Sequence, residues 1–116
     1  DTVTAGARLV TLEAMKMVRE VDHPNLMWML DCFAAYNQGV DVPRAIRQHG
    51  KFLAHVHMND ENKSWPGTGR IDFPSIAQAL KDAGYSGYLS VEVMDLNPDP
   101  ETIAREALKA LRGYFG

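Results

Sequence analysis

Three ionisable residues recur along the sequence at intervals of roughly 30 residues, close to one strand–helix repeat. Asp31 follows an apolar stretch, His57 ends a second one, and Glu92 lies near the end of a third. In a parallel α/β barrel, functional side chains come from the carboxyl ends of successive strands. Carboxylate oxygens and an imidazole nitrogen suit Mn²⁺, Mg²⁺, Co²⁺ or Zn²⁺. The pattern therefore predicts a divalent-metal site formed by Asp31, His57 and Glu92.

Each of these residues also has a structural interpretation. Asp31 could make an Asx-turn at a strand end, which for this residue alone is as frequent as metal ligation. His57 could be a hydrogen-bonded core histidine, the commoner role for a single histidine in an apolar strand. Glu92, between Val91 and Val93, would be costly to bury without a partner or an ion. The coincidence of all three with strand ends favours a site.

Further histidines differ in their expected position. His55 has the same parity as His57, so both should point into the barrel, with His55 one layer deeper. We expect His55 to be structural, with support of a metal ligand as the alternative. His23 and His49 lie near the opposite ends of their elements, and we expect both to be solvated.

Two residues in the loop after His57 are candidates for substrate binding. Lys63 could reach a sugar hydroxyl or phosphate, and a solvated loop lysine is the alternative. Trp65 could wall the pocket or cover the backbone of its own loop. Cys32 follows Asp31, should point away from the site, and is expected to pack in the core.

The first half of the chain alternates between helical and extended patterns. Apolar residues recur with helical spacing between Leu9 and Val21, and a strand buried on both faces is predicted over Leu26–Leu30. A helix over Val42–His49 has proline in its first turn and a glycine C-cap. A second strand is predicted over Phe52–His57.

The second half continues this alternation. Proline and glycine predict a loop over Asn59–Arg70, and Asp72 should cap a helix that closes at Gly84. A third strand is predicted over Tyr88–Val93. Pro100 opens the last helix, whose apolar stripe comprises Ile103, Ala107, Leu108 and Leu111.

Strict alternation of strands and helices predicts a parallel sheet. Three parallel strands cannot close a barrel, and a sheet this small would leave unpaired edges. We therefore expect the chain to be part of a larger protein, which its start at Asp1 without methionine favours, or to complete itself by association.

Composition limits the classes of function. A hydrophobic content of 46% with 23% charged residues is that of a globular domain. The net charge is −3 and the basic residues are scattered, which argues against a nucleic-acid ligand. The longest apolar run, Leu26–Leu30, is too short to span a bilayer. A single cysteine suits a reducing compartment, and we expect a cytoplasmic location.

Three stretches carry a resemblance to a known family. HVHMND (His55–Asp60), PGTGRIDF (Pro66–Phe73) and GYSGYLSVE (Gly84–Glu92) resemble the xylose-isomerase-like TIM-barrel superfamily. That group includes ketose 3-epimerases, hydroxypyruvate isomerase, inosose dehydratase and endonuclease IV. The resemblance implies an α/β fold in which residues 1–116 form a single partial domain, the C-terminal part of a (β/α)8 barrel with its last three strands.

The resemblance also implies a ligand set and a mechanism. Epimerase-like members hold one metal with a Glu, an Asp, a His and a second Glu. Asp31, His57 and Glu92 match the last three, and the first Glu would precede Asp1. The two glutamates move a proton between adjacent carbons through an enediolate, so Glu92 would be a catalytic acid/base group.

Two departures from ketose 3-epimerases concern the substrate. Those enzymes carry a histidine where this chain has Ala34 and an arginine where it has Lys63, whereas Asp41–Ile46 resembles dehydratases of sugar acids and cyclitols. The leading hypothesis is a metal-dependent isomerase or epimerase of a small sugar or sugar phosphate. The alternatives are a dehydratase of a sugar acid or inosose, and a non-catalytic half-barrel. The expected partners are the sugar and either the remainder of the barrel or a second copy.

Overall fold

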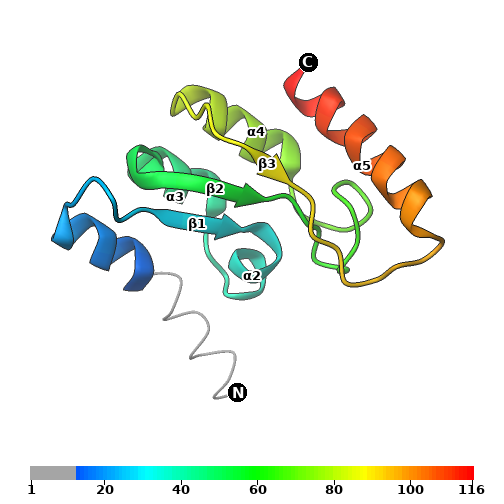
Figure 1. Ribbon diagram of the computed structural model, residues 1–116, viewed down its shortest axis with the longest axis horizontal. Coiled ribbons are helices and arrows are strands. Elements are labelled where there is room, and N and C mark those ends of the chain that lie inside the picture. The colour runs from blue at the N-terminus through cyan, green and yellow to red at the C-terminus, as the bar shows by residue number, and fades with distance from the viewer. Residues whose placement is uncertain (1–12) are drawn as a thin grey trace.

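The computed structural model describes residues 13–116, and Figure 1 shows their arrangement. A helix over residues 13–21 precedes three parallel strands, β1 (Trp28–Asp31), β2 (Leu53–His57) and β3 (Leu89–Ser90), in the sheet order β1-β2-β3. Leu9 and Leu12, which begin the predicted first helix, lie outside the described residues. The parallel strands alternate with helices, which confirms the predicted α/β class and partial barrel.

Helices connect and follow the strands. They are α2 (Cys32–Asn37), α3 (Val42–His49), the short 3₁₀ helix η1 (Gly50–Phe52), α4 (Phe73–Asp82) and α5 (Pro100–Phe115). An aspartate caps each of α3, α4 and α5 by accepting a hydrogen bond from a backbone N–H of the first turn, and proline follows within two positions. These are strong local signals for a helix start, so their positions agree with the sequence analysis.

Strand β1 differs from its prediction in position and in burial. It begins at Trp28 and ends at Asp31, and α2, which was not predicted, starts immediately after it. Trp28 and Leu30 are buried, whereas Met29 is 54% exposed. The prediction of a strand buried on both faces was therefore wrong. Helices cover only one face of this sheet, so alternate side chains remain open to solvent.

Strand β3 is shorter than predicted. It pairs only with β2, through Val56 with Leu89 and His57 with Ser90. Because β2 ends at His57, the residues after Ser90 have no neighbouring strand with which to continue the ladder. Glu92 consequently lies two residues beyond the strand.

The core lies between the sheet and helices α3 and α4. Its fully buried members come from all of these elements and include Leu30, Ile46, Val56, Phe73 and Leu80. Burying such side chains is worth roughly 1.5–3 kcal/mol each, and this layer fixes the strands relative to one another. Among residues 13–116, no helix has the length and apolar character needed to cross a membrane.

Candidate metal centre

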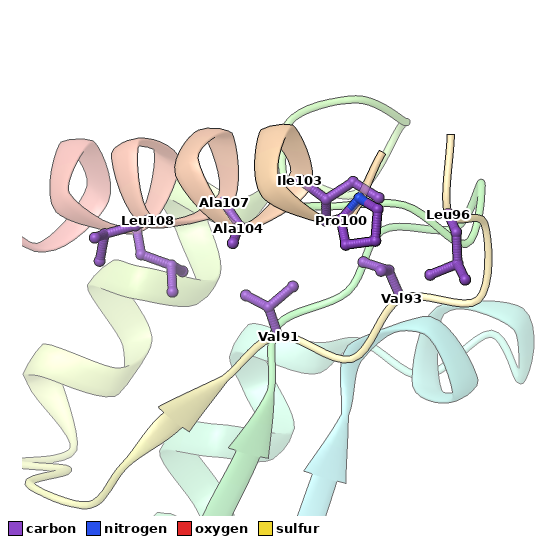
Figure 2. A pocket seen from close by; sticks show the side chains of 9 residues that line it. Val91, Val93, Leu96, Pro100, Ile103, Ala104, Ala107 and Leu108 are labelled. Carbon is purple, nitrogen blue, oxygen red and sulfur yellow. The ribbon is translucent and has the colours of Figure 1, made fainter. Parts of the chain in front are cut away.

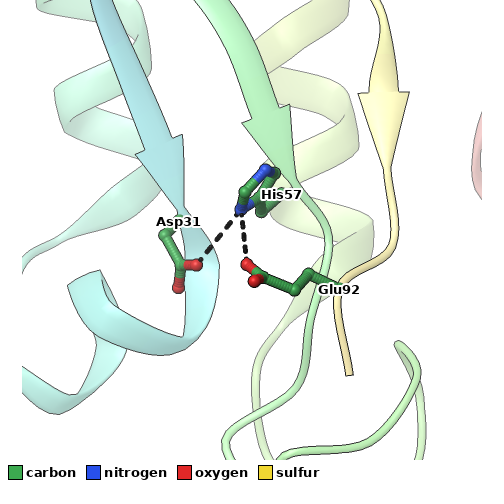
Figure 3. A group of neighbouring side chains, drawn as sticks. All are labelled: Asp31, His57 and Glu92. Atoms are coloured by element: carbon green, nitrogen blue, oxygen red, sulfur yellow. Dashed lines mark ion pairs between the residues drawn. The ribbon is translucent and has the colours of Figure 1, made fainter. Parts of the chain in front are cut away.

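The side chains of Asp31, His57 and Glu92 converge at the carboxyl ends of the strands (Figure 3). Sheet register places Asp31 directly beside His57. His57 Nδ1 lies 3.4 Å from Asp31 Oδ2 and 2.9 Å from Glu92 Oε2. One potential ligand atom from each residue lies within 4.8 Å of the others. The structure thus brings together all three residues that the sequence singled out.

The chemistry of this group fits a divalent cation. His57 Nδ1 is buried within ion-pair distance of two carboxylate oxygens, although neither forms a well-aligned hydrogen bond with it. Ionised carboxylates only accept hydrogen bonds, so two of them on one nitrogen need a proton or a cation between them. Ligands of an ion with bonds of about 2.1 Å stand roughly 3–4 Å apart. The Glu92 side chain is 51% exposed, which leaves it room to adjust.

Asn59 orients Asp31, a contact that the sequence analysis missed. Its Nδ2 donates to Asp31 Oδ2 at 3.2 Å, while its Oδ1 accepts from the Phe33 backbone N–H at 2.9 Å. Asp31 Oδ1 also accepts from the Ala34 N–H at 2.8 Å, which caps α2. Asn59 is only 3% exposed. The signal available in the sequence was a polar residue two positions after the strand end, within HVHMND.

His55 lies beneath the cluster, in agreement with its predicted structural role. Its Nε2 is 2.8 Å from Ser90 Oγ, and its ring meets the His57 ring edge-on at 5.2 Å. The contact with Ser90 joins the neighbouring strands β2 and β3, and the ring contact supports His57 from within β2. His55 is not among the three converging residues.

The two predicted substrate-binding residues occupy different surroundings. Lys63 is exposed, and its backbone adopts the left-handed conformation with φ at 70°. Its carbonyl oxygen accepts hydrogen bonds from the backbone N–H groups of Met94 at 2.9 Å and Asp95 at 3.1 Å. Trp65 is half-buried and lines a groove against α5 that also includes Tyr114. The sequence analysis missed the backbone role of Lys63. Substrate binding by both side chains stays a prediction.

Cys32 does not compete for an ion. It is fully buried, as predicted. Burial, and then the negative charges of Asp31 and Asp60, raise the pKa of its thiol far above the ordinary value. Because a metal ligand or nucleophile must be the thiolate, Cys32 acts as a packing residue.

The two remaining histidines behave differently. His23 is exposed, as predicted, and its Nδ1 accepts from the Asn25 N–H at 3.1 Å. His49 is only partly solvated, so that prediction held in part: the residue is half-buried, and its Nδ1 is buried without a hydrogen-bond partner. Burial, and then the positive charge of Arg19, lower the pKa of His49. The end of α3 lies against β1, where Trp28 Nε1 donates to the His49 carbonyl at 2.9 Å.

Sequence comparison connects this geometry to known enzymes. The model of the xylose isomerase-like TIM-barrel family matches residues 8–114. D-psicose 3-epimerase of Ruminiclostridium cellulolyticum is 39% identical over 80 residues, which cover 69% of this chain and 27% of that protein. Inosose isomerase of Bacillus subtilis is 30% identical over 92 residues, which cover 70% of this chain and 33% of that protein. The chain thus spans about a third or less of these relatives.

Solved structures give the same picture. A structure of L-ribulose 3-epimerase superimposes with a TM-score of 0.81 at 24% identity, covering 90% of this chain and 41% of that one. The IOLI protein with a bound zinc atom superimposes with a TM-score of 0.71 at 26% identity, covering 88% and 42%. The fold of this chain therefore corresponds to about two fifths of a complete barrel.

Proposed function

Because this chain belongs to the xylose isomerase-like TIM-barrel family, we propose that it carries the metal-binding part of an isomerase or epimerase that acts on a small sugar or sugar phosphate. The observation that carries the proposal is the convergence of Asp31, His57 and Glu92, with His57 Nδ1 buried between two carboxylate oxygens. The zinc of the IOLI protein structure and the similarity to D-psicose 3-epimerase support it.

Each residue has a distinct part in this proposal. Asp31, His57 and Glu92 hold the ion, which is Mn²⁺, Mg²⁺, Co²⁺ or Zn²⁺, and Asn59 fixes the Asp31 carboxylate. A bound divalent ion would supply Lewis-acid stabilisation of negative charge on the substrate. Glu92, with its half-exposed carboxylate, takes a proton from the sugar carbon next to the carbonyl. In isomerisation that proton is returned to the neighbouring carbon, whereas in epimerisation the opposing acid/base group protonates the opposite face of the same carbon. Lys63 and Trp65 contact the sugar at the rim.

Completion of the barrel is part of the same proposal. Only one face of the described sheet is covered by helices, and Met29 on the other face is 54% exposed. The remainder of the barrel, or a second copy of the chain, covers that face and supplies the opposing acid/base group. Catalysis therefore belongs to the assembled barrel.

A dehydratase on the same scaffold is the second candidate. Ala34 offers no side chain that could bind a ketose hydroxyl, which is the observation in its favour. Both reactions begin with removal of a proton next to a carbonyl, and the similarity to an epimerase and an isomerase favours isomerisation or epimerisation. Mass spectrometry of the products separates them, because only the dehydratase loses water. A non-catalytic half-barrel would turn over no substrate.

Glu92→Gln in the complete enzyme tests the proposal. Glutamine keeps a carbonyl oxygen for the ion but cannot accept a proton at neutral pH. At saturating Mn²⁺, we expect kcat for epimerisation of ketohexoses, ketopentoses or inososes to fall by about 10²–10⁴-fold. Glu101→Gln on the exposed face of α5 is the matched control and should leave kcat unchanged. Near-normal turnover by Glu92→Gln would refute the proposed proton transfer.

A further inference from the structure

The loop over residues 58–71, called here the His57 loop, contacts both other strand ends of the metal centre. On one side, the buried Asn59 donates to the Asp31 carboxylate and accepts from the Phe33 N–H. These two hydrogen bonds tie the loop to the end of β1 and the start of α2. The loop therefore holds the carboxylate that lies beside His57.

On the other side, the His57 loop holds the segment that carries Glu92. The Lys63 carbonyl accepts from the N–H groups of Met94 and Asp95, two and three residues beyond Glu92. Its left-handed backbone, rare for a lysine, accompanies this orientation of the carbonyl. Because β3 ends at Ser90, these two hydrogen bonds replace the ladder that would otherwise fix the position of Glu92.

The buried carboxylate of Asp60 organises the loop between these two contacts. Asp60 is 0% exposed, and four backbone N–H groups donate to it at 2.9–3.1 Å, those of Glu61, Gly67, Gly69 and Ile71. A buried carboxylate is stable only when its oxygens are satisfied in this way. A Cβ at position 69 would lie 2.6 Å from Asp60 Oδ1, so the loop closes around this carboxylate only with glycine there.

We propose that Asp60 is a positioning residue of the metal centre. By folding the His57 loop, it holds Asp31 and Glu92 on either side of His57. Asp60 itself is not one of the three converging residues, and it acts on them through Asn59 and the Lys63 carbonyl. This inference deepens the proposed function, since it rests on a divalent ion binding at the cluster.

The two contacts should respond differently when the loop loosens. Asp31 keeps its bond to the Ala34 N–H, which belongs to α2 and is independent of the loop. Glu92 is half exposed and follows a strand of only two residues, so its backbone depends more on the Lys63 carbonyl. Loss of Asp60 should therefore disturb the Glu92 segment first.

Asp60→Asn in the full-length polypeptide tests this inference. The new amide nitrogen cannot accept, so two of the four backbone hydrogen bonds are lost. In the metal-free protein, we expect the amides of Met94 and Asp95 to lose protection in hydrogen exchange. The Kd for Mn²⁺, measured by calorimetry, should rise about 10–100-fold, as for other groups that orient metal ligands. Asp99→Asn, the same change at the cap of α5, should alter neither.

Two further variants keep the test decisive if Asp60→Asn does not fold. Asn59→Ser shortens the side chain and removes its hydrogen bond to Asp31, so it should weaken Mn²⁺ binding about tenfold with normal protection at Met94 and Asp95. Lys63→Gly keeps the carbonyl and suits the left-handed backbone, so it should retain Mn²⁺ affinity. If Lys63 also binds the sugar, this variant raises KM without changing metal affinity.

The outcomes separate this inference from the proposed function. Unchanged Mn²⁺ affinity in Asp60→Asn and Asn59→Ser, with normal turnover in the wild type, would overturn the inference alone. Lost protection at Met94 with unchanged Mn²⁺ affinity would also overturn it, because the role of Asp60 would then be structural only. Wild-type protein that binds Mn²⁺ in an Asp60-dependent manner but turns over no sugar would overturn the proposed function alone. Wild-type protein that binds no Mn²⁺ would overturn both.

Discussion

The segment that follows β3 borders two unlike regions of the molecule. Glu92 turns towards the imidazole and carboxylate of the metal centre (Figure 3). Val91 and Val93, its immediate neighbours, turn the other way into an apolar groove against α5 with a volume of about 340 Å³ (Figure 2). One region is held by charges and hydrogen bonds, and the other by apolar packing alone.

Because of this difference, neighbouring residues of one segment contribute to different properties: Glu92 to metal binding, and Val91 and Val93 to folding stability. Contacts among the strand ends and the His57 loop already arrange the metal centre within the described residues. The groove, by contrast, leaves apolar surface uncovered, with Leu96 61% and Leu108 48% exposed. Changes of the three converging side chains should therefore alter metal binding with little effect on folding, and changes on the apolar side should do the opposite.

The largest expected effect is on the polar side. His57→Ala removes the nitrogen ligand and leaves two carboxylates facing each other, so the Kd for Mn²⁺ should rise by about 100-fold or more. Because imidazole acts only as a ligand in the proposed mechanism, excess Mn²⁺ should restore part of the turnover in the assembled barrel. Calorimetry and activity over a Mn²⁺ titration measure both quantities. Full activity at stoichiometric Mn²⁺ would contradict a metal centre at this position.

The next effect is on the apolar side. Ile103 is 5% exposed and lines the groove, so Ile103→Ala should lower the free energy of unfolding by about 2–4 kcal/mol. Mn²⁺ affinity should stay within about twofold, since the change lies outside the ligand contacts. Urea denaturation measures the stability, and Leu108→Ala, at a half-exposed position, is the matched control with a smaller loss. Equal losses in both variants would mean that the groove is more fully packed than its exposure indicates.

The smallest expected effect is on the pH dependence of stability, and it arises at the end of α3, away from both regions. Burial, and then Arg19, lower the pKa of His49 below its ordinary value of 6.5. The unfolded chain therefore binds this proton at a higher pH than the folded chain does. The contribution of His49 to the free energy of unfolding is therefore fully present above pH 6.5, and it is lost as the pH falls through the pKa of His49 in the folded chain. His49→Gln should flatten the decline of the unfolding free energy between pH 7.5 and 5.5, and identical declines in the two proteins would contradict this.

Prediction from the sequence succeeded where the signals are local. Asp72 marks the start of α4 and Pro100 that of α5, and apolar periodicity marks their buried faces. Strand-end positions identified Asp31, His57 and Glu92 because side chains at the carboxyl ends of parallel strands must meet at one edge. Each of these inferences needs only a short window and a general rule of α/β folds.

Other features depend on contacts between distant segments, and the sequence did not reveal them. The short β3 follows from where β2 ends, and the partial burial of His49 follows from packing at the end of α3. Neither property can be read from neighbouring residues, because burial and strand length depend on what the fold places alongside.

By itself, the sequence determined the alternation of the strands with the longer helices, the parallel α/β class and the three polar residues at the strand ends. Only the tertiary structure decided how those residues are held: Asn59 reaches back to Asp31 across 28 positions, and the Lys63 carbonyl binds amides more than 30 positions ahead. The physical reason is that side-chain chemistry and periodicity are local properties of a chain. A hydrogen bond between two loops exists only after the core has packed and brought their backbones within reach.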